Sequence, residues 1–213
     1  MPPDLVSILS EAQEAGFLGP GPLERQFRHA RGFAVVARRL SAPGASGPAP
    51  KVADLGSGGG LPALVVASQW PEATMDLIEA NGRRATFLRV AVDRLGLSGR
   101  VRVQEERAET CGREEMMRGA FDGVTARSFG RPGVVAECAA PLLKPGGWLL
   151  VSEPPSDQTP REPRWPEQAL QQLGLVGEGL VHEEFEYQVL RQTEVCPDRF
   201  PRRNGVPAKR PLF

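Results

Sequence analysis

Residues 51–62 read Lys-Val-Ala-Asp-Leu-Gly-Ser-Gly-Gly-Gly-Leu-Pro, an apolar run that ends in a cluster of glycines. The first five residues predict a buried strand. Three glycines spaced by two, Gly56, Gly58 and Gly60, predict a tight turn whose backbone can approach a ligand closely. Pro62 suits the first turn of a helix, where its missing N–H costs little. The stretch therefore predicts a strand, a glycine loop and a helix.

Strand-like and helix-like segments alternate after this loop. Strands are expected at 51–55, 74–78, 100–104, 121–126 and 148–152, and helices at 61–69, 83–95, 111–118 and 134–143. A proline-rich loop from Pro154 to Pro166, a helix at 167–173 and two extended segments at 175–184 and 185–194 follow. The alternation predicts an α/β fold with a Rossmann-like sheet that is mostly parallel and closes with a C-terminal antiparallel strand.

The N-terminal part has a different pattern. Apolar residues recur at helical spacing over 4–15 and 23–40, and a stretch rich in proline, glycine and alanine follows at 41–50. We therefore expect an N-terminal helical extension over residues 1–45 and a second domain over 46–213.

Composition limits the partners of the chain. The 213 residues carry 26 basic and 26 acidic side chains, so the net charge of zero argues against a generally basic nucleic-acid coat. Three scattered cysteines argue against a disulfide framework and favour a reducing compartment. We find neither a leader pattern nor a run long enough to span a bilayer, and expect a cytoplasmic protein.

The two histidines, His29 and His182, share no metal-ligand spacing with the cysteines. We expect no metal site, and place both histidines at the surface or at an interface. Cys138 lies on an apolar helix and is expected to pack in the core.

The glycine loop has a partner further along the chain. Glu79 ends the next predicted strand, roughly 20 residues on, where a carboxylate accepts the hydroxyls of a ribose. A dinucleotide loop would have a glycine where Leu61 stands, and a P-loop would need Gly-Lys-Ser/Thr. The pattern favours S-adenosylmethionine as a methyl donor. A tight turn without a ligand is the alternative.

We therefore assign the donor to residues of the loop and of the strand ends that follow. These are Asp54, Gly56, Ser57, Gly58, Leu61, Glu79 and Glu109. Glu109 follows the third strand, where such folds often contact the adenine. Its acidic side chain would also be stabilised by the start of a helix, so both interpretations stay open.

Four segments in order resemble the RsmG (GidB) family of methyltransferases. They are Asp54–Pro62, Ile78–Arg89, Arg107–Glu109 and Phe121–Phe129, and the tail Phe200–Leu212 is similar as well. The resemblance implies a class I methyltransferase fold and methylation of N7 of a guanine in 16S ribosomal RNA. It also implies donor contacts at Gly56, Gly58, Glu79, Ala108 and Glu109, and places Arg127 at the active-site mouth as the catalytic candidate.

The chain departs from the family at three places. The Asn-Leu-Thr segment is not visible around 17–20, the histidine-led segment is blurred at 26–29, and Ser152-Glu153 stands where many members have a lysine–glycine pair. A different substrate, either a small molecule or another RNA, and a non-catalytic RNA-binding assembly factor therefore remain alternatives. If the substrate is a small molecule or another RNA, the loop from Pro154 to Pro166 would act as a lid over it.

The chemistry that the family performs needs no general base. N7 of guanine carries an in-plane lone pair and no proton at neutral pH. Orientation and proximity of the two reactants therefore suffice for methyl transfer. Ala126–Phe129 occupies the place of the Asn/Asp-Pro-Pro-aromatic motif of amine methyltransferases. Phe129 either stacks on a flipped base or packs under the loop.

RNA binding needs arginine and lysine at the phosphates. The predicted RNA-binding residues are Arg127 at the expected active-site mouth and Arg202, Arg203, Lys209 and Arg210 in the tail. Proline keeps the tail extended and its basic residues cannot pair locally, although a solvated face or salt-bridge partners remain the alternative. The arginines of the 23–40 helix are either phosphate ligands, or side chains that are solvated or paired in salt bridges. The expected partner is 16S rRNA or an assembly intermediate of the small subunit.

Overall fold

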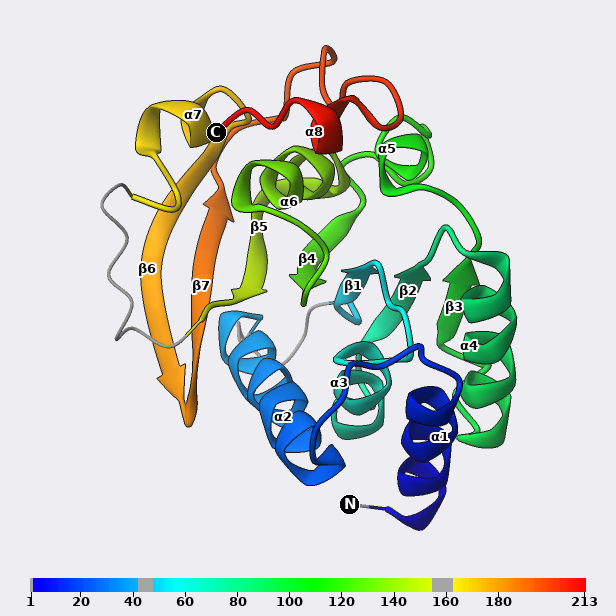
Figure 1. The fold of residues 1–213 in the computed structure, drawn as a ribbon. Coiled ribbons are helices and arrows are strands. Elements are labelled where there is room, and N and C mark those ends of the chain that lie inside the picture. The colour runs from blue at the N-terminus through cyan, green and yellow to red at the C-terminus, as the bar shows by residue number, and fades with distance from the viewer. Residues whose placement is uncertain (1, 42–47, 155–162) are drawn as a thin grey trace.

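The computed structural model describes residues 2–41, 48–154 and 163–213. Its centre is a seven-stranded sheet in the order β3-β2-β1-β4-β5-β7-β6 (Figure 1). The strands are β1 (Lys51–Leu55), β2 (Thr74–Ile78), β3 (Val101–Gln104), β4 (Phe121–Ala126), β5 (Leu143–Ser152), β6 (Leu175–Glu183) and β7 (Phe185–Gln192). The first five run parallel, whereas β7 is antiparallel to both β5 and β6. The predicted fold class is confirmed.

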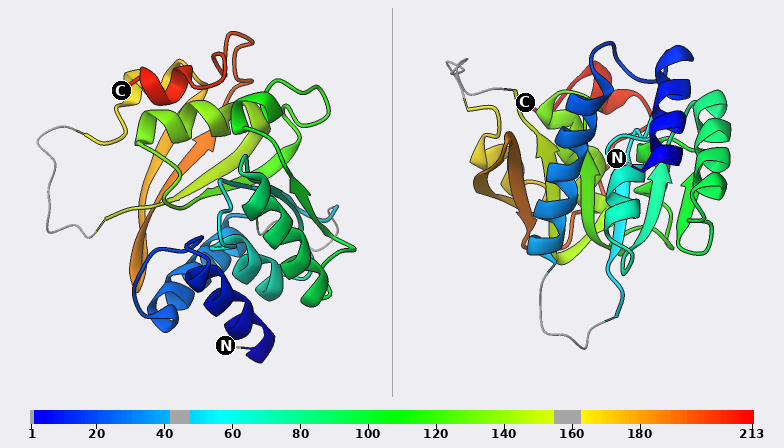
Figure 2. Two further views of the ribbon diagram at one scale, coloured as in Figure 1. Left: turned by 45° about the vertical axis from the view of Figure 1, so that its right-hand side comes forward. Right: turned by 90° about the horizontal axis from the view of Figure 1, so that it is seen from below.

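Helices cover both faces of the sheet (Figure 2). One face carries α1 (Pro3–Glu14), α2 (Leu23–Leu40), α3 (Ala63–Gln69) and α4 (Gly82–Arg94). The other carries α5 (Ala108–Cys111), α6 (Pro132–Ala139), η1 (Ala140–Leu142), α7 (Glu167–Gln171) and α8 (Val206–Lys209). Because parallel strands are covered on both faces, β1 and β4 are buried along almost their whole length. No helix among the described residues is long and apolar enough to cross a membrane.

One prediction about local structure needs correction, and parts of two others fall outside the described residues. The helix predicted at 111–118 is wrong, because α5 ends at Cys111, directly before Gly112, and turns follow as far as residue 118. Glycine weakens a helix through its backbone entropy, which explains the early end. Residues 42–47 of the predicted linker and 155–162 of the predicted lid lie outside the described residues.

The N-terminal helices share a hydrophobic core with the sheet. The segment after α1 covers the glycine loop, since a Cβ on Gly59 would lie 2.6 Å from the Leu18 side chain. On α2, Gly32 leaves room for Tyr187 of β7, whose hydroxyl donates to the carbonyl of His29 at 2.6 Å. The two N-terminal helices therefore hold one side of the region around the loop.

Replacing Gly32 with alanine should lower the free energy of unfolding by about 1–3 kcal/mol, the usual cost of overpacking a core. A Cβ there would lie 2.1 Å from the Tyr187 hydroxyl oxygen. Urea unfolding measures the change, and Gly99→Ala is the control because no atom lies within 4 Å of its Cβ position. Equal stability of the two variants would contradict the close approach.

Candidate functional site

The site lies at the carboxyl ends of β1 and β4, where the strand order reverses. β1 pairs with β2 on one side and with β4 on the other, so the loops after β1 and β4 diverge and leave a crevice. Ligands of open α/β sheets bind at such a switch point. Three adjoining cavities of about 230, 270 and 360 Å³ open there.

We name two cavities by their walls and the third by the part of the donor expected beside Glu79. The loop cavity (230 Å³) lies between the glycine loop and residues 17–19, and the ribose cavity (270 Å³) lies between the end of β2 and α5. The α2 cavity (360 Å³) lies between α2, residues 19–22 and the end of β4. Ser128, with a left-handed backbone (φ 55°), borders all three, and such strain is common at functional sites.

The glycine loop has the backbone that its spacing predicts. Gly56, Gly58 and Gly60 have φ of 64°, 55° and 95°, a region that favours glycine. A Cβ on Gly56 would lie 2.7 Å from the ring of Phe129, so this ring packs against the loop. Ser57 is buried in the loop, and its hydroxyl donates to the Asp54 carbonyl. Leu61 borders the loop cavity.

Glu79 links the end of β2 to the loop. One carboxylate oxygen accepts a hydrogen bond from the N–H of Gly58 and the other from the N–H of Asn81, each at 2.8 Å. The side chain is 6% exposed, and it lines the ribose cavity. Backbone donors thus fix the carboxylate before any ligand arrives.

Two buried polar atoms beside the loop have no partner in the described chain. They are Oδ2 of Asp54 and Nη1 of Arg127. Burial raises the pKa of Asp54 to about 6, although Thr125 donates to its Oδ1 at 2.5 Å. Burial also lowers the pKa of Arg127, whose Nη2 donates to Gln26. A buried guanidinium with a free N–H fits a ligand that carries a carboxylate.

Glu109 holds the C-terminal tail. Its carboxylate accepts from the N–H of Gly205 at 2.8 Å and is 7% exposed. Glu109 also lies in the first turn of α5, as its helix-start interpretation requires. Ala108 and the tail residue Ala208 border the ribose cavity together. The tail therefore forms one wall of the cavity.

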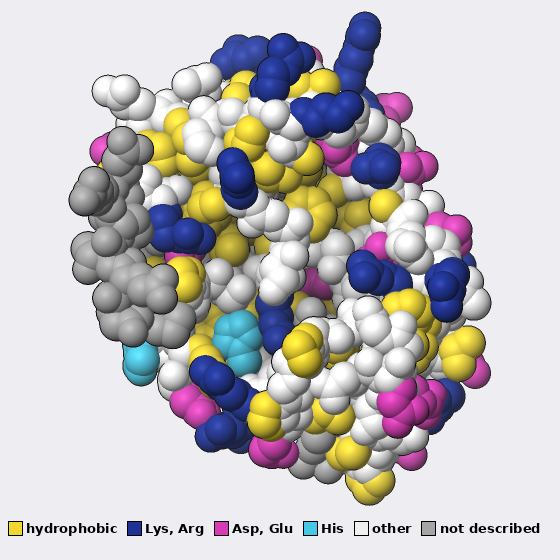
Figure 3. Space-filling view, viewed as in Figure 1, with side chains coloured by type: hydrophobic (Ala, Val, Ile, Leu, Met, Phe, Trp, Pro, Cys, Tyr) yellow, Lys and Arg dark blue, Asp and Glu magenta, His cyan; other side chains and the backbone are white. Residues whose placement is uncertain are grey.

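One basic residue of the tail forms an ion pair within the fold. Arg202 pairs with the fully buried Glu137, 65 residues earlier in the chain, through Nε at 2.8 Å and Nη2 at 2.5 Å. The prediction that the tail's basic residues do not pair locally does not extend to such a distant partner. The Arg202 side chain is therefore held within the fold, and its contact with RNA stays a prediction. Arg203, Lys209 and Arg210 are exposed and form no ion pair within the described residues. Basic side chains gather over this end of the molecule, above a central hollow (Figure 3).

The arginines of α2 divide into two groups. Arg28 and Arg39 pair with Glu184 and Glu183 at the turn between β6 and β7. Arg25 is exposed, borders the α2 cavity, and has no ion-pair partner in the part of the chain that the structure describes.

Glu153, which stands where many family members have a lysine–glycine pair, is also paired within the fold. Glu153 accepts hydrogen bonds from Arg164 Nε at 2.6 Å and from Trp165 Nε1 at 2.8 Å. Its charge is therefore compensated within the fold and adds no uncompensated negative charge beside the site.

The histidines and cysteines have different surroundings. His182 is exposed on β6, whereas His29 is half-buried beside the α2 cavity. Cys111, Cys138 and Cys196 are buried, which confirms packing for Cys138. No cluster with the ligands for a metal occurs among the described residues. No local pattern predicts a cavity at Gln26 and His29, because its walls come from α2, from the residues after β4 and from β7, which are far apart in the chain.

Comparisons with known proteins agree on one family. Residues 37–160 match the family GidB, described as rRNA small subunit methyltransferase G. The chain is 39% identical to the ribosomal RNA small subunit methyltransferase G of Prochlorococcus marinus, over 75% of this chain and 66% of the relative. It is 40% identical to that of Rubrobacter xylanophilus, over 77% and 66%. The chain thus spans about two thirds of the length of these relatives.

One solved structure supports the fold alone. An O-methyltransferase from Bacillus cereus, in complex with SAH, has a TM-score of 0.63 at 15% identity, over 91% of this chain and 92% of that one. With the glycine loop, Glu79 and the switch-point crevice in place, and with more than half of the chain matched, the chain belongs to the GidB family, rRNA small subunit methyltransferase G.

Proposed function

We propose that the protein transfers a methyl group from S-adenosylmethionine to N7 of a guanine in 16S ribosomal RNA. The observation that carries the proposal is the fixed Glu79 carboxylate beside the glycine loop at the switch point. Family membership and the family's name support the substrate class.

The residues of the crevice suit the parts of the donor. Glu79 accepts from the ribose hydroxyls, and Ala108 with Glu109 borders the adenine side. Asp54, Gly56, Ser57, Gly58 and Leu61 surround the amino-acid part, where Arg127 offers its unpartnered Nη1 to a carboxylate. When bound, the donor supplies a methyl group activated on a sulfonium.

The residues of the protein then need only to orient the methyl donor and the guanine. N7 attacks with its lone pair and no proton leaves, so no side chain needs to act as a base. Arg127, which borders both the loop cavity and the α2 cavity, lies where donor and acceptor meet. Holding reacting groups in line is worth several kcal/mol of barrier.

The RNA contacts fall on exposed basic residues. Arg203, Lys209 and Arg210 of the tail and Arg25 of α2 are exposed and available for phosphates. Arg25 borders the α2 cavity, and the tail borders the ribose cavity at Ala208. We propose 16S rRNA, alone or in a small-subunit assembly intermediate, as the partner and the cytoplasm as the location.

The test uses the purified protein with methyl-tritiated donor and three acceptors: deproteinised 16S rRNA, small subunits and an assembly intermediate, each from a strain that lacks the gene. Digestion to nucleosides should show the label in 7-methylguanosine. Donor binding with no label in 16S rRNA would point to a different substrate. Absence of donor binding would point to a non-catalytic factor.

A further inference from the structure

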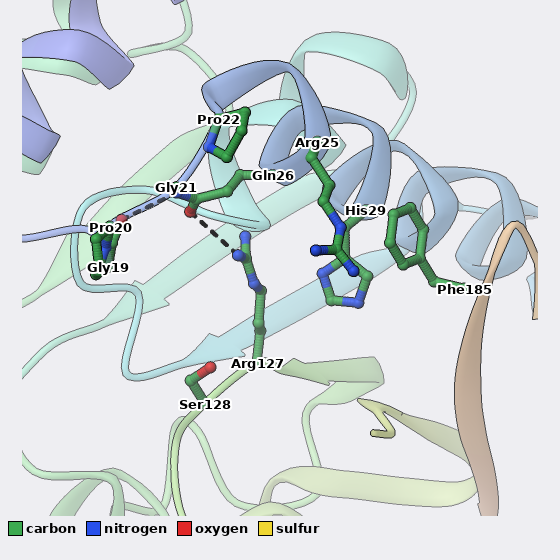
Figure 4. Close-up of a pocket in the computed structure, with 10 residues that line it drawn as sticks. All are labelled: Gly19, Pro20, Gly21, Pro22, Arg25, Gln26, His29, Arg127, Ser128 and Phe185. Atoms are coloured by element: carbon green, nitrogen blue, oxygen red, sulfur yellow. Dashed lines mark hydrogen bonds between the residues drawn. The ribbon is translucent and has the colours of Figure 1, made fainter. Parts of the chain in front are cut away.

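The α2 cavity adjoins the donor side but is a separate space. Its walls include Pro22 and His29 on α2 and its approach, Phe185 on β7, and Ser128 after β4. Gly19, Gln26, Arg127 and Ser128 border both this cavity and the loop cavity. In Figure 4, Arg127 and Ser128 lie toward one end of the cavity, and His29 and Phe185 toward the other. A molecule in the cavity would have one edge toward the donor and the opposite edge toward His29.

The His29 ring is fixed by aromatic neighbours. It stacks on Tyr187 with centroids 5.4 Å apart and meets the edges of Phe185 at 4.8 Å and Phe33 at 5.6 Å. The Tyr187 hydroxyl holds the helix backbone at the same residue. The ring nitrogens, however, form no hydrogen bond within the described residues, although the ring is half-buried and borders the cavity.

The charge state of His29 defines what it can bind. Burial lowers the pKa of His29 to about 4, and the positive charges of Arg127 and Arg25 act in the same direction. At neutral pH the imidazole is therefore uncharged, with one N–H donor and one acceptor nitrogen. Such a group suits a neutral, planar ligand with a polar edge and does not attract an anion.

We infer that the α2 cavity receives the guanine that is methylated, and that His29 accepts a hydrogen bond from its N1–H or 2-amino group. The inference rests on the proposed function, because it requires N7 to face the donor. N7 and the N1–H/2-amino edge lie on opposite sides of guanine, as the two ends of the cavity do. Adenine lacks both donors on that edge, so His29 would favour guanine.

Arg25 completes the subsite. It projects beside His29 in Figure 4, is exposed at the rim, and has no ion-pair partner in the described ranges. A base seated in the cavity would carry its sugar and phosphate outward to this rim, where a guanidinium binds phosphate well.

The test measures binding of guanosine 5′-monophosphate (GMP) and adenosine 5′-monophosphate (AMP) to the full chain saturated with S-adenosylhomocysteine. We expect wild type to prefer GMP. His29→Ala should weaken GMP binding about fivefold to tenfold, the worth of one or two hydrogen bonds, with little change for AMP. The preference should therefore fall by the same factor. His29→Asn, which keeps a donor and an acceptor, should retain part of it.

Matched controls separate recognition from folding. His182→Ala changes an exposed histidine and should leave the GMP preference unchanged. Arg25→Ala should weaken the binding of GMP and AMP alike. Arg31→Ala, which removes another exposed arginine of α2, should leave GMP binding unchanged. Unchanged affinity of His29→Ala for S-adenosylmethionine shows an intact fold. Equal losses for GMP and AMP, a retained preference, or no GMP binding by wild type would overturn the inference.

The two proposals fail in different ways. If wild type does not label 16S rRNA, the proposed function fails, whatever the nucleotide preference. If it forms 7-methylguanosine while His29→Ala keeps both the GMP preference and the methylation rate, only the role of His29 fails.

Discussion

Glu79→Ala should raise the Kd for S-adenosylmethionine at least about 100-fold. The carboxylate faces the ribose cavity at 6% exposure, and the N–H groups of Gly58 and Asn81 hold it in place. Two hydrogen bonds from ribose hydroxyls to a charged acceptor are worth about 3–6 kcal/mol, and 2.7 kcal/mol is already a factor of about 100. Isothermal titration with the donor measures the change.

Two other variants make this result interpretable. Glu79→Gln keeps one acceptor oxygen and should lie between wild type and alanine. Glu72→Ala removes an exposed carboxylate near the opposite end of β2 and should bind the donor as wild type does. If Glu79→Ala bound the donor with unchanged affinity, the carboxylate would serve only to hold the loop, and the ribose assignment would be wrong.

The sequence predicts this part of the site because the signals are local. The strand, the glycine loop and the helix are continuous in residues 51–69, and positive φ at Gly56, Gly58 and Gly60 follows from residue type. Predicting that Glu79 lies beside the loop requires one further argument. Neighbouring parallel strands bring their carboxyl ends to one edge, so the residue after β2 lies beside the loop after β1.

Contacts between distant segments had no such signal. Glu137 and Arg202 are 65 residues apart, and nothing local shows that the only acid of α6 is buried under the tail. The composition of the tail predicts an extended segment without local ion pairs. In the folded chain, however, Arg202 of the tail forms an ion pair with the distant Glu137. The α2 cavity is hidden for the same reason, since its walls come from α2, β4 and β7.

Short helices such as α5 are also difficult to predict from the sequence. Glu114-Glu115-Met116-Met117 have good helix propensity, yet they lie in turns within the segment predicted as a helix. An isolated turn of helix gains little from propensity, and Gly112 ends α5 before these residues.

Arg202→Ala should lower the free energy of unfolding by about 3 kcal/mol, the low end for removing one partner of a buried pair, because Arg202 is partly exposed. Glu137 is fully buried and would keep only the hydrogen bond from the backbone N–H of residue 202. Urea unfolding measures the loss. Donor affinity should fall as well, because the released tail carries Ala208 away from the ribose cavity.

Arg203→Ala is the matched control, since the neighbouring side chain is exposed and forms no ion pair within the described residues. Its stability should stay within about 0.5 kcal/mol of wild type. Under the proposed function it should instead weaken RNA binding and reduce the salt dependence of that binding by about one unit of slope. Equal unfolding of the two variants would show that the pair contributes nothing to stability.

A double substitution separates the cost of an unpaired charge from the value of the pair. Glu137→Leu together with Arg202→Met removes both charges and leaves apolar groups of similar length. Buried ion pairs are often replaced this way at little cost, so the double variant should recover most of the stability lost in Arg202→Ala. Recovery would mean that the arginine serves mainly to neutralise Glu137. Failure to recover would mean that its hydrogen bonds to the carboxylate and to the carbonyl of Arg210 hold the tail in place.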